Sequence, residues 1–224
     1  MKTAFITGST SGIGKALAKE LIKKEYKIIL HGRNKKRLQA TADEIGKENI
    51  LAVIEADLTQ PGIGHFIFDK MKKQKVHIDL IVNNAGFGLY GDFTKTDWKT
   101  ESEMIAVNIT ALTEFTKLAL IKMKKQGGGH IINIASTAAF QPGPLMSVYF
   151  ATKAYVLSFT ESIAEEAKKY RVKVQVMCPG AVATEFQKKY NSFLIEMANK
   201  YGVKTILTSD VHYAYPEDAE LQDT

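Results

Sequence analysis

Three side chains in the second half of the chain combine a proton donor with groups that could activate it. Tyr149 and Lys153 are four residues apart in a strongly helical stretch, so both lie on one helix face. A phenol ionises near pH 10, about three units too high for efficient proton transfer at neutral pH, and a neighbouring ammonium lowers its pKa. Ser136 follows the apolar run HIINIA and could polarise a carbonyl beside the tyrosine. These residue types suit proton transfer to or from a carbonyl oxygen.

Asn108 is a further polar candidate, within the apolar helical stretch MIAVNITALTEF. An asparagine in the middle of a helix is unfavourable unless its amide has a hydrogen-bonding role. A catalytic amide and a purely structural one both satisfy that condition. A histidine could also transfer protons at neutral pH. However, no histidine of this chain is expected to lie at a strand end, facing the crevice, with a partner that could activate it. The histidines are His31, His65, His77, His130 and His212.

A glycine-rich turn, TGSTSGIG (7–14), joins the first apolar run to the first helical pattern. Glycine permits positive φ and close approach of a phosphate, and the N-terminus of the following helix attracts anions. A plain tight turn is the alternative, but it requires fewer glycines and hydroxyls. The turn between a strand and a helix therefore predicts a dinucleotide site. The residues expected to bind it are Gly8, Ser9, Ser11, Gly12, Ile13 and Gly14.

The end of the second apolar run indicates which dinucleotide binds. NAD sites of this architecture place an acid there to hold the ribose hydroxyls. This chain reads His31-Gly32-Arg33-Asn34 and has no acid until Asp43. Arg33 could hold a 2′-phosphate through paired hydrogen bonds, which predicts NADP(H) rather than NAD(H) as the cofactor. A solvent-facing basic helix start is the alternative.

These side chains need a framework, and the chain alternates short β-branched runs with amphipathic helical patterns. Apolar strands that are each followed by a helix predict a parallel sheet covered on both faces. We therefore expect an α/β fold with a doubly wound, Rossmann-like, mainly parallel sheet of six or seven strands. The expected strands are 3–7, 26–31, 50–55, 79–83, 130–135 and 172–177. The expected helices are 15–24, 35–46, 64–74, 100–125 and 150–169.

Taken together, the motifs resemble the short-chain dehydrogenase/reductase family. They occur in the family's order across residues 1–187, which we take as the dinucleotide-binding and catalytic domain. The matching segments are TGSTSGIG (7–14), Asp57-Leu58, NNAG (83–86), Asn108, Ser136, YFATK (149–153) and PGAVAT (179–184). The resemblance implies a seven-stranded Rossmann-like sheet, a nicotinamide cofactor and an Asn–Ser–Tyr–Lys tetrad.

The resemblance also implies a role for each matching residue. Tyr149 would be the acid/base, Ser136 would orient the carbonyl, and Lys153 would lower the tyrosine pKa and hold the nicotinamide ribose. Asn108 would position a water near Lys153. Toward the cofactor, Asp57 would contact the adenine, Asn84 and Ala85 the adenosine ribose, and Val182 and Thr184 the nicotinamide amide. The same cofactor site would include Leu58, Gly86, Pro179 and Gly180.

Composition suits a soluble cytoplasmic protein that acts on small molecules. Of 224 residues, 45% are hydrophobic, which suffices for one core, and the net charge of +6 is spread over helix faces rather than massed in one block. The single cysteine, Cys178, suits a reducing compartment. We expect no signal peptide, no stretch able to span a bilayer, and neither nucleic acid nor membrane as partner. The expected helices at 100–125 and 150–169 resemble the family's dimer-forming pair, which predicts a homodimer or homotetramer.

The C-terminal segment, residues 188–224, departs from the family pattern. Residues 192–224 resemble a fragment of the PHP domain of bacterial replicative DNA polymerases. Asp210 and His212 would match metal-assisting residues there, but a metal site needs more converging ligands, so no metal is expected. Residues 203–208 could still supply a seventh strand. An apolar substrate pocket is expected from Phe87, Leu89, Phe140, Pro142, Phe186 and Tyr190.

Two functions fit these observations. The first is an NADP(H)-dependent oxidoreductase that interconverts a carbonyl and an alcohol. The second is a nucleotide-binding sensor or scaffold that keeps the fold without turnover. All four tetrad positions are occupied by the expected residue types, which favours the enzyme.

Overall fold

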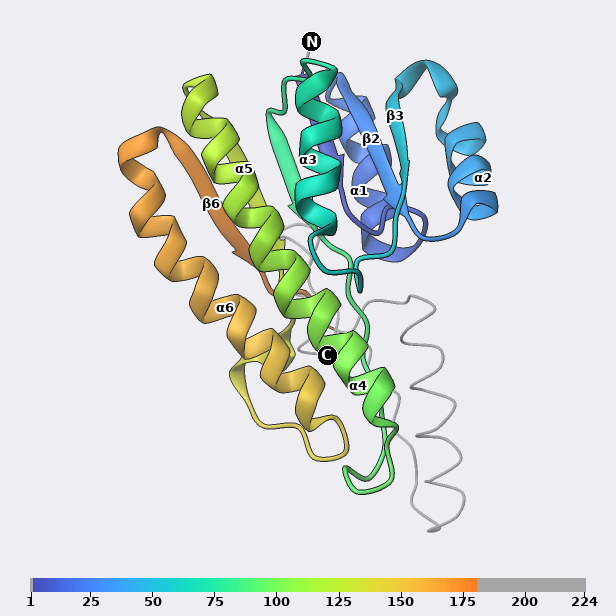
Figure 1. The fold of residues 1–224 in the computed structure, drawn as a ribbon, viewed down its shortest axis with the longest axis vertical. Coiled ribbons are helices and arrows are strands. Elements are labelled where there is room, and N and C mark those ends of the chain that lie inside the picture. The colour runs from blue at the N-terminus through green and yellow to red at the C-terminus, as the bar shows by residue number, and fades with distance from the viewer. Residues whose placement is uncertain (1, 181–224) are drawn as a thin grey trace, which may run out of the picture.

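The computed structural model describes residues 2–180 and contains one six-stranded, entirely parallel sheet (Figure 1). The strands run in the order β3-β2-β1-β4-β5-β6. Their bounds are β1 Lys2–Ile6, β2 Tyr26–Gly32, β3 Ile50–Glu55, β4 Leu80–Asn83, β5 Gly129–Ile134 and β6 Val172–Met177. Each expected strand is confirmed to within one residue at either end. The inner strands β1, β2, β4 and β5 are recognisable as apolar runs because both of their faces are largely buried, whereas alternate residues of the edge strands β3 and β6 are exposed.

Helices cover both faces of this sheet, as the alternating pattern predicted. Their bounds are α1 Gly12–Lys23, α2 Lys35–Ile45, α3 Ile63–Lys73, α4 Trp98–Ile105, α5 Leu112–Gln126 and α6 Ser147–Ala167. Successive side chains of β1 point to opposite faces and enter two separate cores. Phe5 packs with residues of α3 and α5, whereas Ala4 and Ile6 pack with residues of α1 and α2. Figure 1 shows α3, α5 and α6 in front of the sheet.

A π-helical turn, Ala106–Ala111, joins α4 to α5 without a break, so Trp98–Gln126 forms one helical stretch of 29 residues. By length and composition alone, this helical stretch could cross a membrane. The expectation that no stretch of the chain would be long and apolar enough is therefore wrong by that criterion. Its residues Phe115, Ala119 and Met123 lie instead in the core against the sheet. A core helix of a soluble protein has the same apolar composition.

The strand order reverses between β1 and β4, which are neighbours in the sheet although two strands separate them in sequence. In doubly wound sheets the crevice for ligands opens beyond the carboxyl ends of the strands at such a point. The turn after β1, the loop after β4 and the loop after β5 therefore meet at one edge. The segment 188–224, with the expected seventh strand at 203–208, lies outside the described residues.

Candidate active site

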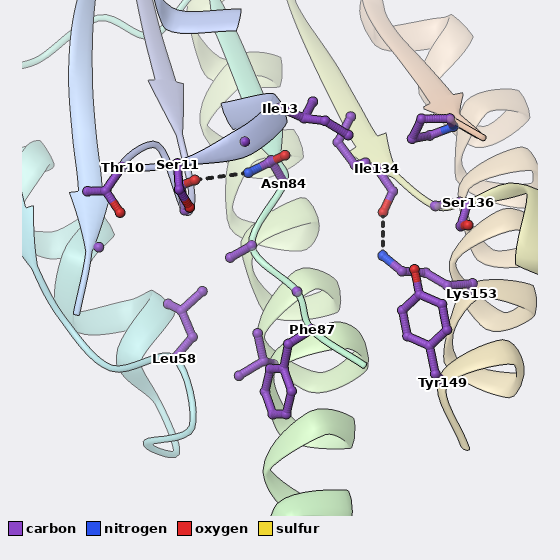
Figure 2. A pocket seen from close by; sticks show the side chains of 18 of the residues that line it. Thr10, Ser11, Ile13, Leu58, Asn84, Phe87, Ile134, Ser136, Tyr149 and Lys153 are labelled. Atoms are coloured by element: carbon purple, nitrogen blue, oxygen red, sulfur yellow. Dashed lines mark hydrogen bonds between the residues drawn. The ribbon is translucent and has the colours of Figure 1, made fainter. Parts of the chain in front are cut away.

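A cavity of about 870 Å³ opens at this edge of the sheet. Residues that follow β1, β2, β3, β4, β5 and β6 all contribute to its lining, together with the start of α6. Figure 2 shows Thr10 and Ser11 on one side of it and Ser136, Tyr149 and Lys153 on the other. The cavity is large enough to hold a small organic ligand together with part of a cofactor.

The glycine turn forms one end of the cavity and has the geometry that a phosphate needs. Gly8 and Gly12 have φ values of +64° and +51°, a region that favours glycine. A Cβ on Gly14 would lie 2.4 Å from the carbonyl oxygen of Gly8, so only glycine lets α1 pack this closely on the turn. Ser11 precedes α1 but its side chain makes no capping hydrogen bond. The N-terminal amides of α1 therefore face the cavity without a side-chain partner.

Two expectations about this turn are corrected by the structure. Ser9 was expected to contact the cofactor, but it is fully buried, and its hydroxyl donates to the His31 carbonyl at 3.2 Å and accepts from the His31 amide at 2.9 Å. His31 was not expected to face the crevice, yet it lines the cavity at the end of β2. Its Nδ1 accepts a hydrogen bond from the Gly8 amide at 3.2 Å. Burial lowers the pKa of His31 to about 4, so the ring is neutral at pH 7.

The end of β4 is tied directly to the glycine turn. Asn84 donates through Nδ2 to the carbonyl oxygens of Thr7 and Gly8, at 2.9 and 3.1 Å. The Thr7 hydroxyl accepts from the amides of Asn84 and Ala85, both at 2.9 Å. Two of these four hydrogen bonds come from the Asn84 side-chain amide and two from backbone amides, and together they hold the end of β4 against the glycine turn. Asn84, Ala85 and Gly86 all line the cavity.

Cations gather where β2 passes into α2. Arg33 and Arg37 are exposed, and both line the cavity. Asn34 caps α2 by accepting the Arg37 amide at Oδ1, at 3.0 Å, and the first turn of this helix contains no acid. Asp57 and Leu58 follow β3 and line the same end. This end therefore offers the positive groups that a ribose phosphate would need.

Ser136, Tyr149 and Lys153 meet at the other end, between β5 and α6 (Figure 2). The Ser136 hydroxyl accepts from the Ala138 amide at 3.1 Å and also hydrogen-bonds with the Tyr149 side chain. Lys153 is 5% exposed, and its Nζ donates to the Ile134 carbonyl at 3.0 Å. The Nζ atom also lies 5.7 Å from the centre of the Tyr149 ring. The spacing of four residues thus places both side chains on the face of α6 that borders the cavity.

Burial controls the ionisation of this pair. It raises the pKa of Tyr149, and the hydrogen bond from Ser136 offsets this only in part. It lowers the pKa of Lys153 to about 8. Lys153 was expected to lower the tyrosine pKa, but desolvation is the larger effect here and raises it. The lysine ammonium donates a hydrogen bond to the Ile134 carbonyl.

Asn108 lies in the π-helical turn and behind the cavity wall rather than in it. Its Oδ1 accepts the Phe87 amide at 3.1 Å, while Nδ2 donates to the Phe87 carbonyl at 2.9 Å and to the Thr152 hydroxyl at 3.0 Å. The side chain therefore joins α6 to the loop after β4. Of the two readings, the described contacts match the structural amide, since every polar atom of the side chain has a protein partner.

A family comparison agrees with this geometry. The family model described as short chain dehydrogenase matches residues 2–194, which is most of the chain. The chain belongs to the short-chain dehydrogenase family. The match extends into the segment that was likened to a PHP domain, and that likeness is not borne out.

Individual relatives of this short-chain dehydrogenase point the same way. An uncharacterized oxidoreductase of Staphylococcus epidermidis is 37% identical over 187 residues, covering 82% of this chain and 79% of the relative. Human 17-beta-hydroxysteroid dehydrogenase type 3 is 36% identical over 209 residues, covering 91% of this chain and 66% of the relative. The chain is thus related to oxidoreductases along most of its length.

Solved structures similar to this short-chain dehydrogenase contain either nicotinamide cofactor. A 3-ketoacyl-(acyl-carrier-protein) reductase from Brucella melitensis, complexed with NADH, is 29% identical with a TM-score of 0.77, over 84% of this chain and 78% of the other. A short-chain dehydrogenase from Sphingobium yanoikuyae, in complex with NADPH, is 28% identical with a TM-score of 0.77, over 98% of this chain and 92% of the other. Likeness to these structures supports nicotinamide binding without selecting between the two cofactors.

The structure brings together most of the residues expected in the site of this dehydrogenase. The expected residues that line the cavity are Gly8, Ser11, Gly12, Ile13, Arg33, Asp57, Leu58, Asn84, Ala85, Gly86, Ser136, Tyr149, Lys153, Pro179 and Gly180. Ser9, Gly14 and Asn108 support the wall from behind. Val182 and Thr184 lie outside the described residues.

The expected substrate pocket is corrected in part. Phe87 lines the cavity, but Leu89, Phe140 and Pro142 do not, and Phe140 is 66% exposed. Phe186 and Tyr190 lie outside the described residues. Lining residues that the sequence reasoning missed include Thr10, His31, Arg37, Gln141, Met146 and Phe150. A signal was present for two of them, because Thr10 lies within the glycine turn 7–14 and Phe150 is the residue next to Tyr149.

Proposed function

We propose that this chain is an NADP(H)-dependent oxidoreductase that interconverts a carbonyl compound and an alcohol. One observation carries the proposal: Ser136, Tyr149 and Lys153 converge at one end of a cavity whose other end is a glycine turn and a helix N-terminus. A nucleotide site alone would suit many functions. A proton donor placed beside it gives the bound molecule a defined chemistry.

The residues present fit a nicotinamide dinucleotide. The amides of α1 and the backbone of the glycine turn would hold the pyrophosphate. A Cβ on Gly86 would lie 3.0 Å from Asn108 Oδ1 and 3.5 Å from Lys153 Nζ, so this position keeps the wall open beside the lysine. Lys153 would hold the nicotinamide ribose. When bound, the reduced nicotinamide supplies a hydride to the carbonyl carbon.

The side chains then complete the reduction at the carbonyl oxygen. As the carbon gains the hydride, the π electrons of the C=O bond move to oxygen, which must receive a proton. The Ser136 hydroxyl donates a hydrogen bond to that oxygen, and the Tyr149 phenol transfers its proton to it, which yields the alcohol. The raised pKa keeps Tyr149 protonated at neutral pH, which is the form that reduction needs. The nearby Lys153 ammonium stabilises the phenolate that remains.

Arg33 is the basis for proposing NADP(H) as the cofactor. It borders the nucleotide end of the cavity together with Arg37, and the first turn of α2 has no acid to repel a phosphate. Asp57 lies at the same end, but the two arginines outweigh its single negative charge, and the local charge still favours an anion. The similar dehydrogenase from Sphingobium yanoikuyae is in complex with NADPH. We further propose that residues 1–187 form the working domain and that the enzyme acts on small molecules in the cytoplasm.

The test is NADPH oxidation by the purified protein with a panel of ketones and aldehydes, repeated with Tyr149→Phe. Loss of general acid catalysis lowers turnover by about 10²–10⁴-fold, while NADPH affinity measured by fluorescence should stay within about twofold. Tyr155→Phe is the control, since this exposed tyrosine lies on the same helix but does not line the cavity. A Tyr149→Phe protein that keeps more than about a tenth of wild-type turnover would contradict the mechanism. Tight NADPH binding with no turnover by the wild type would favour a sensor or scaffold.

A further inference from the structure

Charge is distributed unevenly along the cavity. At the nucleotide end its charged lining residues are Arg33, Arg37 and Asp57. Around Ser136 and Tyr149, within residues 2–180, Lys153 is the sole charged side chain in the lining. That lysine is buried and already donates to the Ile134 carbonyl. Within the described residues, the end of the cavity around Ser136 and Tyr149 therefore has no exposed charge that could pair with a charged substituent on a substrate.

Apolar side chains occupy the wall beside the tyrosine instead. Met146 is 8% exposed and lines the cavity from the loop after β5. Phe150 is half-buried, lines the same wall and packs edge to face on Tyr149, with ring centres 6.0 Å apart. Phe87 contributes a further aromatic ring from the loop after β4 (Figure 2). Gln141 is an exposed, neutral polar residue on this lining.

The backbone of the loop after β5 is constrained in a way that keeps this wall in place. A Cβ on Gly143 would lie 2.3 Å from the Phe150 ring, so glycine allows the loop to lie directly against the aromatic ring. Leu145 has a φ of +65°, which is unfavourable for a leucine, and its carbonyl accepts the Gly91 amide at 2.8 Å. The next residue, Met146, is turned into the cavity. Strain of this kind persists where the surrounding structure imposes it, often at binding sites.

We infer that the substrate of this site is an uncharged ketone, or the matching alcohol, with a large apolar substituent that packs against Met146, Phe150 and Phe87. The inference rests on the proposed function and adds the chemical class of the substrate. An anionic substituent would lose its hydration at this wall and gain no opposite charge, which strongly disfavours binding. An apolar substituent gains up to about fourfold in affinity for each buried methylene.

The experiment compares two ketones with the same ring, methyl para-acetylbenzoate and para-acetylbenzoate, which is ionised at pH 7. We expect kcat/KM with NADPH to favour the ester by roughly tenfold or more. Calorimetric titration of each ketone into the complex of the protein with NADP⁺, in which no reduction can occur, should likewise show that the ester binds more tightly than the acid. A free acid that is reduced or bound as well as the ester would overturn the inference.

A variant that adds the missing charge sharpens this test. Gln141→Arg should narrow the preference for the ester by roughly tenfold, because a guanidinium on the lining would pair with the carboxylate. Gln74→Arg is the matched control, since Gln74 is exposed at the end of α3, is not part of the lining, and should leave the ratio unchanged. If Gln141→Arg leaves the ratio of kcat/KM for the ester to that for the acid unchanged, the substrate does not bind against this part of the lining, and the inference fails.

These measurements separate the two proposals. If neither ketone is reduced but calorimetry still favours the ester, the substrate class stands and the proposed reaction fails. If ketones are reduced without regard to charge, the proposed reaction stands and the substrate class fails. A protein that binds neither ketone overturns the inference.

Discussion

Lys153 is a residue whose function conflicts with stability. Its pKa is lowered from 10.5 to about 8 by burial. Below pH 8 the lysine is charged in both the folded and unfolded states, so the folded state bears the full cost of burying the charge. Between about pH 8 and 10.5 the folded protein loses the proton first, so stability rises with pH across that window. A difference of about 2.5 pH units corresponds to on the order of 3 kcal/mol.

Lys153→Met should therefore stabilise the protein while abolishing turnover. We expect the free energy of unfolding of the cofactor-free protein to rise by roughly 1–3 kcal/mol at pH 7, less than the full cost because the Ile134 carbonyl loses its donor. Urea unfolding at pH 7 and near pH 10 measures this, and the gain should shrink at the higher pH. A variant that is less stable than wild type at pH 7 would show that burial of this charge is not costly.

Arg33 belongs to the same scale, because a single side chain is proposed to select the cofactor. Charge-assisted hydrogen bonds to a phosphate are worth about 1.5–3 kcal/mol, so Arg33→Ala should weaken NADPH binding by roughly tenfold to a hundredfold and leave NADH nearly unchanged. Nicotinamide fluorescence titrations with both cofactors measure the difference. Lys35→Ala is the control, since Lys35 is a neighbouring exposed cation that does not line the cavity. Equal loss for both cofactors would refute the role of Arg33.

At the scale of elements, the close approach of α1 to the turn after β1 depends on Gly14. A Cβ there would lie 2.4 Å from the Gly8 carbonyl oxygen and 2.5 Å from Asn84 Nδ2. Gly14→Ala should push α1 away and disturb the hydrogen bonds from Asn84, destabilising the protein by about 1–3 kcal/mol. Denaturant unfolding and NADPH titration should both show the loss. Lys23→Ala, at the exposed last turn of α1, should change stability by less than about 0.5 kcal/mol. A Gly14→Ala protein as stable as this control would mean that α1 can shift freely.

At the scale of the whole molecule, α5 and α6 present an outward face that suits self-association. Tyr155 stacks on Phe159 with ring centres 5.6 Å apart, and its hydroxyl hydrogen-bonds to Thr113 of the neighbouring helical stretch at 3.0 Å. Tyr155 and Ile121 are both exposed, at 37% and 45%. Exposed aromatic and aliphatic groups on adjoining helices are typical of an interface.

We therefore expect a homodimer, or a homotetramer that contains it. Light scattering at micromolar concentration should give at least twice the monomer mass. Ile121→Glu should shift the mass toward the monomer, because a carboxylate would be buried unpaired between the helices. Phe66→Glu, at an exposed position on α3, should leave the mass unchanged. A wild-type protein that is monomeric under these conditions would refute the expectation.

The sequence by itself determined the six described strands, the helices between them and the places of the glycine turn and the Ser136, Tyr149 and Lys153 trio. These features are readable because they are local. A short apolar, β-branched run marks a strand of a covered parallel sheet, and a spacing of four residues fixes a shared helix face whatever the rest of the fold does. The order of the motifs along the chain then placed them at successive strand ends, where a parallel sheet gathers them.

Tertiary packing alone decided which of these side chains reach the cavity and how they ionise. Ser9 turns inward to the His31 backbone, Asn108 is held by Phe87 and Thr152, and Glu114 of α5 accepts the amides of Gly64 and His65 at the start of α3. None of these partners is near in sequence. The raised pKa of Tyr149 and the lowered pKa of Lys153 likewise follow from desolvation by residues brought together across the fold. Local patterns specify backbone elements, whereas side-chain direction and desolvation depend on contacts that exist only once distant segments have packed.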